Sequence, residues 1–174
     1  MDYFEFYNIP FSFFPDEEAL RKTYYANSKK YHPDFYTLAS PEEQQRALEL
    51  SSLNNEAFKT LTDFDKRMKY ILQSKGMIGA EGQNEIPQQF LMEMMDINEA
   101  LMELEFDYNK EAHQKILDTL QAIEKDLLNE VMPLLKKYPH TTDEERILNA
   151  AKDYYFKKRY LLRIRENLNK FASL

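Results

Sequence analysis

All three glycines of this 174-residue chain lie in one short segment, Gly76-Met77-Ile78-Gly79-Ala80-Glu81-Gly82-Gln83-Asn84. Glycine frees the backbone and ends helices, so the two long glycine-free stretches on either side can form uninterrupted helices. Both stretches are rich in Leu, Met, Glu and Lys, and they lack the alternating Val/Ile runs that are typical of strands. The sequence therefore predicts an all-α protein with domains at residues 1–76 and 87–174, joined by a linker at 77–86.

Four helices are expected before the linker: Asp2 to about Tyr7, Asp16 to about Tyr31, Ser40 to Leu61, and Phe64 to Ser74. Asp16 and Ser40 are good N-cap residues, and Pro41 and Glu43 follow Ser40 as in a capping box. Three longer helices are expected after the linker: Pro87 to about Asp107, Lys110 to about Tyr138, and Thr142 to about Phe171. Three amphipathic helices joined by short turns favour an antiparallel bundle.

Composition excludes several classes of function. The chain has no cysteine, and its three histidines are far apart, so no metal or other cofactor is expected. The sequence has no run of about twenty apolar residues, so no membrane span is predicted. The N-terminus has neither the charged nor the apolar region of a signal peptide, which predicts a cytoplasmic protein. The net charge of -7 disfavours nonspecific binding to nucleic acid. The sequence contains no recognisable nucleophile–base pair and no phosphate-binding loop, so an enzyme is not expected.

The tripeptide His32-Pro33-Asp34 follows a basic helical stretch that carries Arg21, Lys22, Lys29 and Lys30. Proline disfavours α-helical backbone at the residue before it, so the helix should end near Tyr31. An imidazole and a carboxylate then lie in a short polar loop between two helices. The alternative is an ordinary turn, in which Asp34 only accepts hydrogen bonds from the backbone that follows.

These features resemble a J-domain. The next predicted helix carries Asn55-Glu56-Ala57-Phe58-Lys59-Thr60-Leu61, which resembles the family's core signature, and Asp63, Arg67 and Tyr70 follow at the expected positions. Phe64 stands where the family usually has proline, and Tyr25 and Ala26 stand where it is often basic. The resemblance implies that the domain stimulates ATP hydrolysis by a DnaK- or HscA-type chaperone. It implies chaperone contacts at His32, Pro33, Asp34, Arg21, Lys22, Lys29 and Lys30.

The segment from Met77 to Phe106 contains seven acidic residues and no basic one. Within it, the helical repeat places one set of residues on a single stripe: Met92, Met95, Asp96, Glu99 and Glu103. Methionines suit an adaptable binding surface, and carboxylates can complement a basic partner. The alternative is that Leu91, Met95, Ile97 and Leu101 form bundle core while the acids face solvent.

The second half narrows the resemblance to the HscB-type co-chaperones of iron–sulfur cluster assembly. It rests on Asp2-Tyr3-Phe4, on the bundle that directly follows the J-domain, and on Phe90-Leu91-Met92-Glu93-Met94-Met95-Asp96-Ile97. The resemblance implies that the bundle binds an IscU-type scaffold protein. It implies contacts at Leu91, Met92, Met95, Asp96, Glu99 and Glu103, with an aromatic on the last helix, either Tyr160 or one of Tyr155 and Phe156.

Two alternatives remain open at this stage. The chain could be a general J-domain adaptor whose bundle binds another client or only dimerises. It could instead be a helical nucleic-acid-binding protein that uses Lys157, Lys158, Arg159, Arg163 and Arg165 with the neighbouring aromatics. His113 and His140 are expected at the surface.

Overall fold

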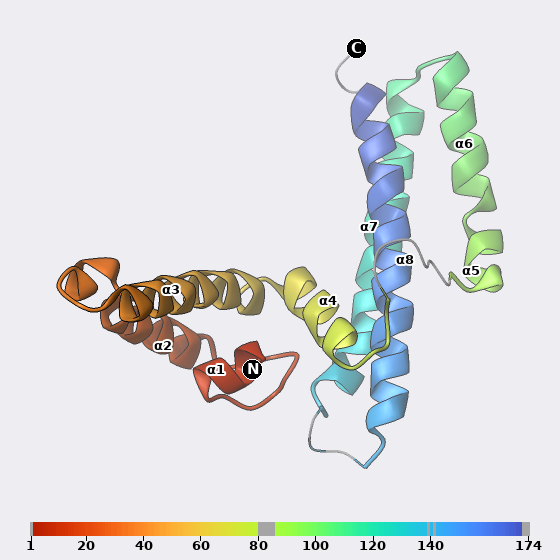
Figure 1. Cartoon of the computed structure of the whole chain (residues 1–174). Coiled ribbons are helices and arrows are strands. Elements are labelled where there is room, and N and C mark those ends of the chain that lie inside the picture. The colour runs from red at the N-terminus through yellow and green to blue at the C-terminus, as the bar shows by residue number, and fades with distance from the viewer. Residues whose placement is uncertain (1, 80–85, 139, 141, 172–174) are drawn as a thin grey trace. The chain divides into compact units, whose positions relative to one another are not determined.

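The computed structural model describes residues 2–79, 86–138, 140 and 142–171, in which every regular element is a helix (Figure 1). The elements are α1 Tyr3–Tyr7, α2 Glu17–Lys30, the 3₁₀ helix η1 Pro33–Tyr36, α3 Pro41–Leu61, α4 Phe64–Ser74, α5 Gln88–Glu93, α6 Met95–Phe106, α7 Lys110–Leu135 and α8 Glu144–Phe171. No helix in these ranges has both the length and the apolar character needed to cross a bilayer.

The chain divides into two compact units, Met1–Ile71 and Leu72–Leu174. The division falls inside α4, whereas the sequence predicts it at the glycines that follow this helix. Residues 80–85 of the predicted linker lie outside the described residues. The predicted domain limits of 1–76, 77–86 and 87–174 therefore stay predictions.

The helix starts of the first unit follow the predicted caps. The Asp16 carboxylate accepts hydrogen bonds from the amides of Glu18 and Ala19 at 2.8 and 3.1 Å. Ser40 and Glu43 form the predicted capping box, in which the Ser40 hydroxyl accepts from the Glu43 amide and the Glu43 carboxylate accepts from the Ser40 amide. Each cap satisfies backbone donors that a helix start would otherwise leave without a partner.

Apolar residues from α1, α2, α3, α4 and the segment between α1 and α2 form the core of this unit. The fully or almost fully buried side chains include Phe4, Tyr7, Phe13, Leu20, Ala47, Ala57, Leu61, Met68 and Ile71.

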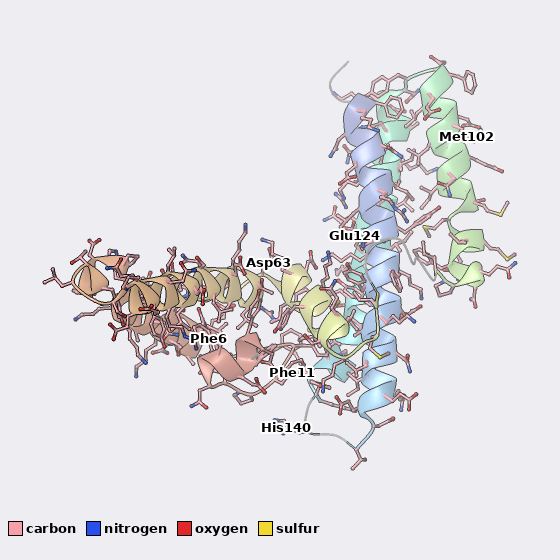
Figure 2. The ribbon with its side chains drawn as sticks, viewed as in Figure 1. Phe6, Phe11, Asp63, Met102, Glu124 and His140 are labelled. Carbon is pink, nitrogen blue, oxygen red and sulfur yellow. The ribbon has the colours of Figure 1, made fainter. Side chains whose placement is uncertain are left out.

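The J-domain-like signature residues Asp63 and Tyr70 make contacts around this core. Asp63 (labelled in Figure 2) caps α4 by accepting from the Asp65 and Lys66 amides at 3.0 Å, and the bond from Lys66 lowers the pKa of its carboxyl. The Tyr70 ring stacks on Tyr3 at 4.4 Å.

The buried Arg67 guanidinium fastens the segment before α2 to the end of α3. Its Nε donates to the carbonyl oxygen of Phe13 at 2.8 Å, and its Nη1 donates to that of Leu61. Burial lowers the pKa of this guanidinium. An arginine pairs these two carbonyls through its fixed fork of donors, which a lysine does not have.

Asn54 joins three elements of the first unit. Its side chain is 1% exposed. Nδ2 donates to the carbonyl oxygen of Tyr24 at 3.1 Å and to the Ser28 hydroxyl at 3.0 Å, while Oδ1 accepts from the Tyr7 hydroxyl at 3.0 Å. Burial raises the pKa of that tyrosine, which keeps the hydroxyl protonated as a donor. A buried amide with all these partners specifies one packing of α1, α2 and α3.

We expect Asn54→Leu to lower the free energy of unfolding by about 2 kcal/mol, because an apolar side chain of similar size leaves buried polar groups without partners. Urea unfolding followed by circular dichroism measures the change. Asn55→Leu is the matched control: Asn55 is exposed and accepts one surface hydrogen bond, from the Tyr24 hydroxyl at 3.1 Å. The control should change stability by less than about 0.5 kcal/mol. Equal effects from the two substitutions would contradict the assigned role of Asn54.

The second unit is a bundle in which α7 and α8 lie side by side and α5 and α6 pack against one part of them (Figure 1). Its core cluster comprises Phe90, Met94, Ile97, Leu101, Leu104, Ile116, Leu120, Leu161, Ile164 and Leu168. The helix expected from Pro87 to Asp107 is divided at Met94 (φ -86°, ψ -3°), between the end of α5 at Glu93 and the start of α6 at Met95. Met94 is buried and belongs to the same core face as Phe90 and Ile97.

Two expectations for this unit need correction. His113 is buried, not on the surface: its Nε2 lies 3.2 Å from the carbonyl oxygen of Leu168, which requires the ring to donate from Nε2. The helical repeat explains this, since His113 is three residues before the core residue Ile116. The last helix begins at Glu144, two residues after the predicted Thr142, because the first carbonyl that accepts a helical bond is that of Asp143, from the Ile147 amide at 3.4 Å.

A polar group formed by Lys75, Tyr138 and Glu144 lies within the second unit. Lys75 Nζ is 2.8 Å from Glu144 Oε1, which also accepts a 2.8 Å hydrogen bond from the Tyr138 hydroxyl. The bond from Lys75 lowers the pKa of the Glu144 carboxyl, and the bond to Glu144 raises the pKa of the Lys75 ammonium. Both shifts favour the charged pair in the folded protein.

This group predicts a pH-dependent contribution to stability. Because the folded-state pKa of Glu144 lies below its unfolded value, the contribution is present above the unfolded pKa of about 4.5 and is lost as pH falls through the folded pKa. The carboxylate is half-exposed, so screening keeps the contribution below about 1 kcal/mol. We expect Glu144→Gln to lower Tm by a few degrees at pH 7, with the difference shrinking in melts at pH 3.5. A Tm difference that is the same at both pH values would contradict this.

Candidate partner-binding sites

The His32-Pro33-Asp34 loop begins directly after α2. Tyr31 closes the helix, and His32 has extended backbone (φ -64°, ψ 126°), which is the conformation that a following proline favours. Pro33 is the first residue of η1. Tyr36, the last residue of η1, donates from its hydroxyl to the carbonyl oxygen of Lys30 at 3.0 Å. The loop is therefore held at both ends, by the proline and by this hydrogen bond to α2.

The His32 imidazole is bound on one edge and open on the other. The Asp34 amide donates to His32 Nδ1 at 3.3 Å, and the Phe35 ring meets the imidazole edge to face with centroids 6.0 Å apart. A neutral histidine that accepts through Nδ1 carries its proton on Nε2. The side chains of His32 and Asp34 are 53% and 83% exposed. Nε2–H and the Asp34 carboxylate can therefore both reach a partner.

Nδ1 of His32 also lies 3.6 Å from the Asp34 carboxylate. The two contacts need different protonation states, because Nδ1 accepts from the amide only when it is unprotonated and pairs with the carboxylate only when it carries a proton. Beside the loop is an open pocket of about 430 Å³, lined by Pro33, Asp34 and Tyr36 from the loop and by Gln44 and Leu48 among others from α3. His32 does not line it, so the imidazole and this pocket do not form one catalytic cleft.

All four predicted basic residues of α2 are exposed, but they do not form one cluster. The helical repeat places Lys22 and Lys29, seven residues apart, on the same face. Arg21 and Lys30, nine residues apart, lie about half a turn from each other, on opposite flanks of that face. Only Lys29 and Lys30 are at the end of α2 that leads into the loop. Two of the four positive charges, those of Lys29 and Lys30, therefore lie near the loop. Lys22 and Arg21 are farther along α2, and Arg21 is the most remote.

Sequence reasoning missed the exposed apolar residues around this loop. Tyr25, Phe35, Leu38 and Leu48 are all exposed large hydrophobic side chains. Phe35 is the most informative of them, because it lies next to Asp34 in the chain and its ring touches His32. A sequence does not separate such residues from core aromatics. For Phe35 and Leu38 the only signal is their position in a connection that is too short to bury them, and Tyr25 on α2 and Leu48 on α3 give no signal.

The predicted scaffold-binding residues on α5 and α6 share one exposed face. Leu91, Met92 and Met95 are exposed, as are Asp96, Glu99 and Glu103. The core residues of the same helices, Phe90, Met94, Ile97, Leu101 and Leu104, point into the bundle. The alternative in which Leu91 and Met95 are core is therefore wrong, while its assignment of Ile97 and Leu101 to the core is confirmed.

Of the three aromatic candidates on α8, Tyr160 is the one beside α6. Its hydroxyl accepts a 2.8 Å hydrogen bond from Asn98 Nδ2, and its ring meets Phe90 edge to face at 5.8 Å. Tyr155 and Phe156 are buried. Tyr160 therefore borders the exposed face of α6. The rings of Tyr155 and Phe156 are buried and are not available to a partner there.

The same burial weakens the nucleic-acid alternative. Tyr154, Tyr155 and Phe156 are buried, and Arg159 and Lys158 lie over the Tyr155 and Tyr154 rings at 5.6 and 5.9 Å. Bases stack on aromatic faces that are exposed to solvent. The aromatic residues of this helix are instead occupied by the core and by their own cationic neighbours. Among the described residues, no group of three or more His, Asp or Glu could hold a metal ion.

Comparisons with known proteins agree with this architecture. Residues 86–169 match the family model described as the HSCB C-terminal oligomerisation domain. The co-chaperone protein HscB homolog of Shewanella amazonensis is 29% identical over 171 residues, covering 98% of this chain and 96% of that protein. The homolog of Vibrio cholerae is 32% identical over 120 residues, covering 68% and 70%. The crystal structure of human co-chaperone protein HscB matches with a TM-score of 0.71 at 29% identity, covering 97% of this chain and 81% of that one.

The fold and these likenesses define a co-chaperone, a class of proteins that are not themselves enzymes. The chain belongs to the HscB co-chaperone family. The predicted family and the predicted all-α fold class are therefore confirmed.

Proposed function

We propose that this co-chaperone stimulates the ATPase of a DnaK/HscA-type chaperone through the His32-Pro33-Asp34 loop and delivers an IscU-type iron–sulfur scaffold protein through the exposed face of α5 and α6. The observation that carries the first part is the loop itself, in which the imidazole and the carboxylate are exposed while the backbone around them is fixed. The second part is supported by exposed Leu91, Met92 and Met95 beside the carboxylates of Asp96, Glu99 and Glu103.

Each surface suits a different partner. Lys29, Lys30 and the more distant Arg21 and Lys22 attract an acidic surface and mainly raise the association rate. His32 and Asp34 then make polar contacts, and these shift the chaperone toward ATP hydrolysis only if they bind one of its conformations better than the other. The acidic face of α5 and α6 instead suits a basic partner with apolar side chains.

One chain that carries both sites raises the effective concentration of the scaffold near the chaperone. This distinguishes delivery from a general adaptor function, in which the bundle would bind another client. The cytoplasmic location, and the absence of nucleic acid and membrane among the partners, stay predictions.

Steady-state ATP hydrolysis by a DnaK/HscA-type chaperone tests the proposal, with the scaffold and this protein added separately and together. We expect this protein to raise the rate alone, and to raise it more than additively when the scaffold is present. Stimulation without any effect of the scaffold would favour the general adaptor. No stimulation of any such chaperone would overturn the proposal.

A further inference from the structure

The exposed apolar face of the bundle continues past the residues that the family resemblance assigns to it. Met102 and Phe106 are 61% and 89% exposed. Figure 2 shows Met102 on the side of α6 that faces away from α7 and α8. We call Met92, Met95, Met102 and Phe106 together the methionine stripe. Single exposed apolar residues are ordinary, but four along one line form a patch of the kind that marks interaction sites.

The helical repeat explains why these side chains line up. Met102 is seven residues after Met95, and Phe106 is four residues after Met102, so all three lie within about 40° of one another around α6. The core residues Ile97, Leu101 and Leu104 project from the opposite side. At about 1.5 Å per residue, the line within α6 from Met95 to Phe106 is about 16 Å long, and Met92 precedes it on α5. This is the length of a partner segment of several turns rather than of a single side chain.

Charge gives the stripe two different edges. Asp96, Glu99 and Glu103 lie along one edge, at rotations of about 40° to 100° from Met95. On the other side lie Asn98, which is bound to Tyr160, and the exposed Glu105 near the end of α6. Neither α5 nor α6 contains a lysine or an arginine. With three carboxylates on one edge and one on the other, the surface fits an apolar segment whose basic side chains lie mostly along the edge of Asp96, Glu99 and Glu103.

The same charges disfavour a second copy of this chain as the occupant. In a symmetric pair whose α6 helices run antiparallel, the stripe of one copy would face the stripe of the other, and the carboxylates beside each stripe would come close together. Like charges brought together at an interface cost several kcal/mol. A basic partner avoids this cost and gains from the same carboxylates.

We propose that Met102 and Phe106 extend the scaffold-binding surface to the end of α6, where they bind an apolar, basic-edged segment of the scaffold protein. The predicted apolar contacts on this helix stop at Met95, whereas the predicted acidic contacts reach Glu103. Met102 and Phe106 supply the apolar contacts beside that last carboxylate. This inference rests on the proposed function of the bundle.

The affinity of an IscU-type scaffold protein for the full chain tests the inference, measured by isothermal titration calorimetry. We expect the double variant Met102→Ala/Phe106→Ala to bind about tenfold more weakly or worse, because truncating apolar anchors removes most of the energy of such contacts. Phe106→Leu keeps a large apolar side chain and should bind within about threefold of the parent. Leu162→Ala on α8 is the control for removing an exposed apolar side chain elsewhere in the unit, and it should leave the affinity unchanged.

Other outcomes separate this inference from the proposed function. If the double variant binds like the parent while Leu91→Ala binds more weakly, the scaffold site stands and its extension is wrong. If the parent chain binds no scaffold, both are wrong. Sedimentation equilibrium adds a third outcome: if the parent dimerises, the double variant is monomeric and the two bind scaffold equally, the stripe is a contact between copies, which overturns the inference.

Discussion

Replacing His32 with glutamine is expected to return ATP hydrolysis by a DnaK/HscA-type chaperone to its unstimulated rate. Glutamine can still donate and accept hydrogen bonds, but it has no ring to hold a donor where Nε2 lies. The imidazole is positioned by the Asp34 amide at 3.3 Å and by the Phe35 ring at 6.0 Å, and a flexible side chain keeps neither arrangement. A loss of about 1.4 kcal/mol in preference for the hydrolysing conformation already reduces stimulation about tenfold.

The substitution should leave the fold intact. His32 is half-exposed, and the loop is held by Pro33 and by the bond from Tyr36 to Lys30, neither of which depends on the imidazole. An unchanged melting curve checks this. His140→Gln is the matched control, because His140 is an exposed histidine in the second unit (labelled in Figure 2) and should keep full stimulation. A His32→Gln protein that stimulates like the parent would mean that the tripeptide is only a turn.

The backbone of this loop could be predicted because proline restricts its neighbour whatever the tertiary context. The side-chain surroundings could not, because they depend on long-range packing. Tyr25 and Phe35 are aromatic residues that a sequence assigns to the core as readily as Phe4 or Phe13, yet the first two are exposed and the last two are buried. Only the completed fold shows which aromatic faces remain uncovered.

Adjacent residues of one type show the same limit. Asn55 belongs to the J-domain-like signature, but Asn54 is the buried amide that joins α1, α2 and α3. The difference between them is a rotation of about 100° around α3, which local propensity does not report. His113 was expected at the surface because it is polar. It is buried because it lies on a core face and the fold offers it a hydrogen-bond partner, the carbonyl oxygen of Leu168.

The bundle face was more open to prediction, because it combines two independent signals. A run of acids without a base marks a charged surface, and the helical repeat separates Met92 and Met95 from Ile97 and Leu101. What the repeat alone left open is which side meets the core. The structure answers this: Met94 is buried on the same side as Ile97 and Leu101, while Met92 and Met95 are exposed.

Truncating the two central methionines of this face should abolish most scaffold binding. We expect Met92→Ala combined with Met95→Ala to weaken the affinity for an IscU-type scaffold about a hundredfold, or about 2.7 kcal/mol, because both side chains are exposed in the free protein and are free to lose water on binding. The melting temperature should hardly change, since neither methionine contributes to the core.

A matched pair of single variants sharpens this result. Leu91 and Leu162 are 39% and 40% exposed, and they lie on different helices of the same unit. If burial against the scaffold is the cause, Leu91→Ala should weaken binding while Leu162→Ala does not. Stimulation of ATP hydrolysis without scaffold should be unchanged in all of these variants, because the His32-Pro33-Asp34 loop is intact. Normal scaffold affinity in the double methionine variant would contradict the site and favour a general adaptor, because the proposed delivery function would then lack its contact surface on this chain.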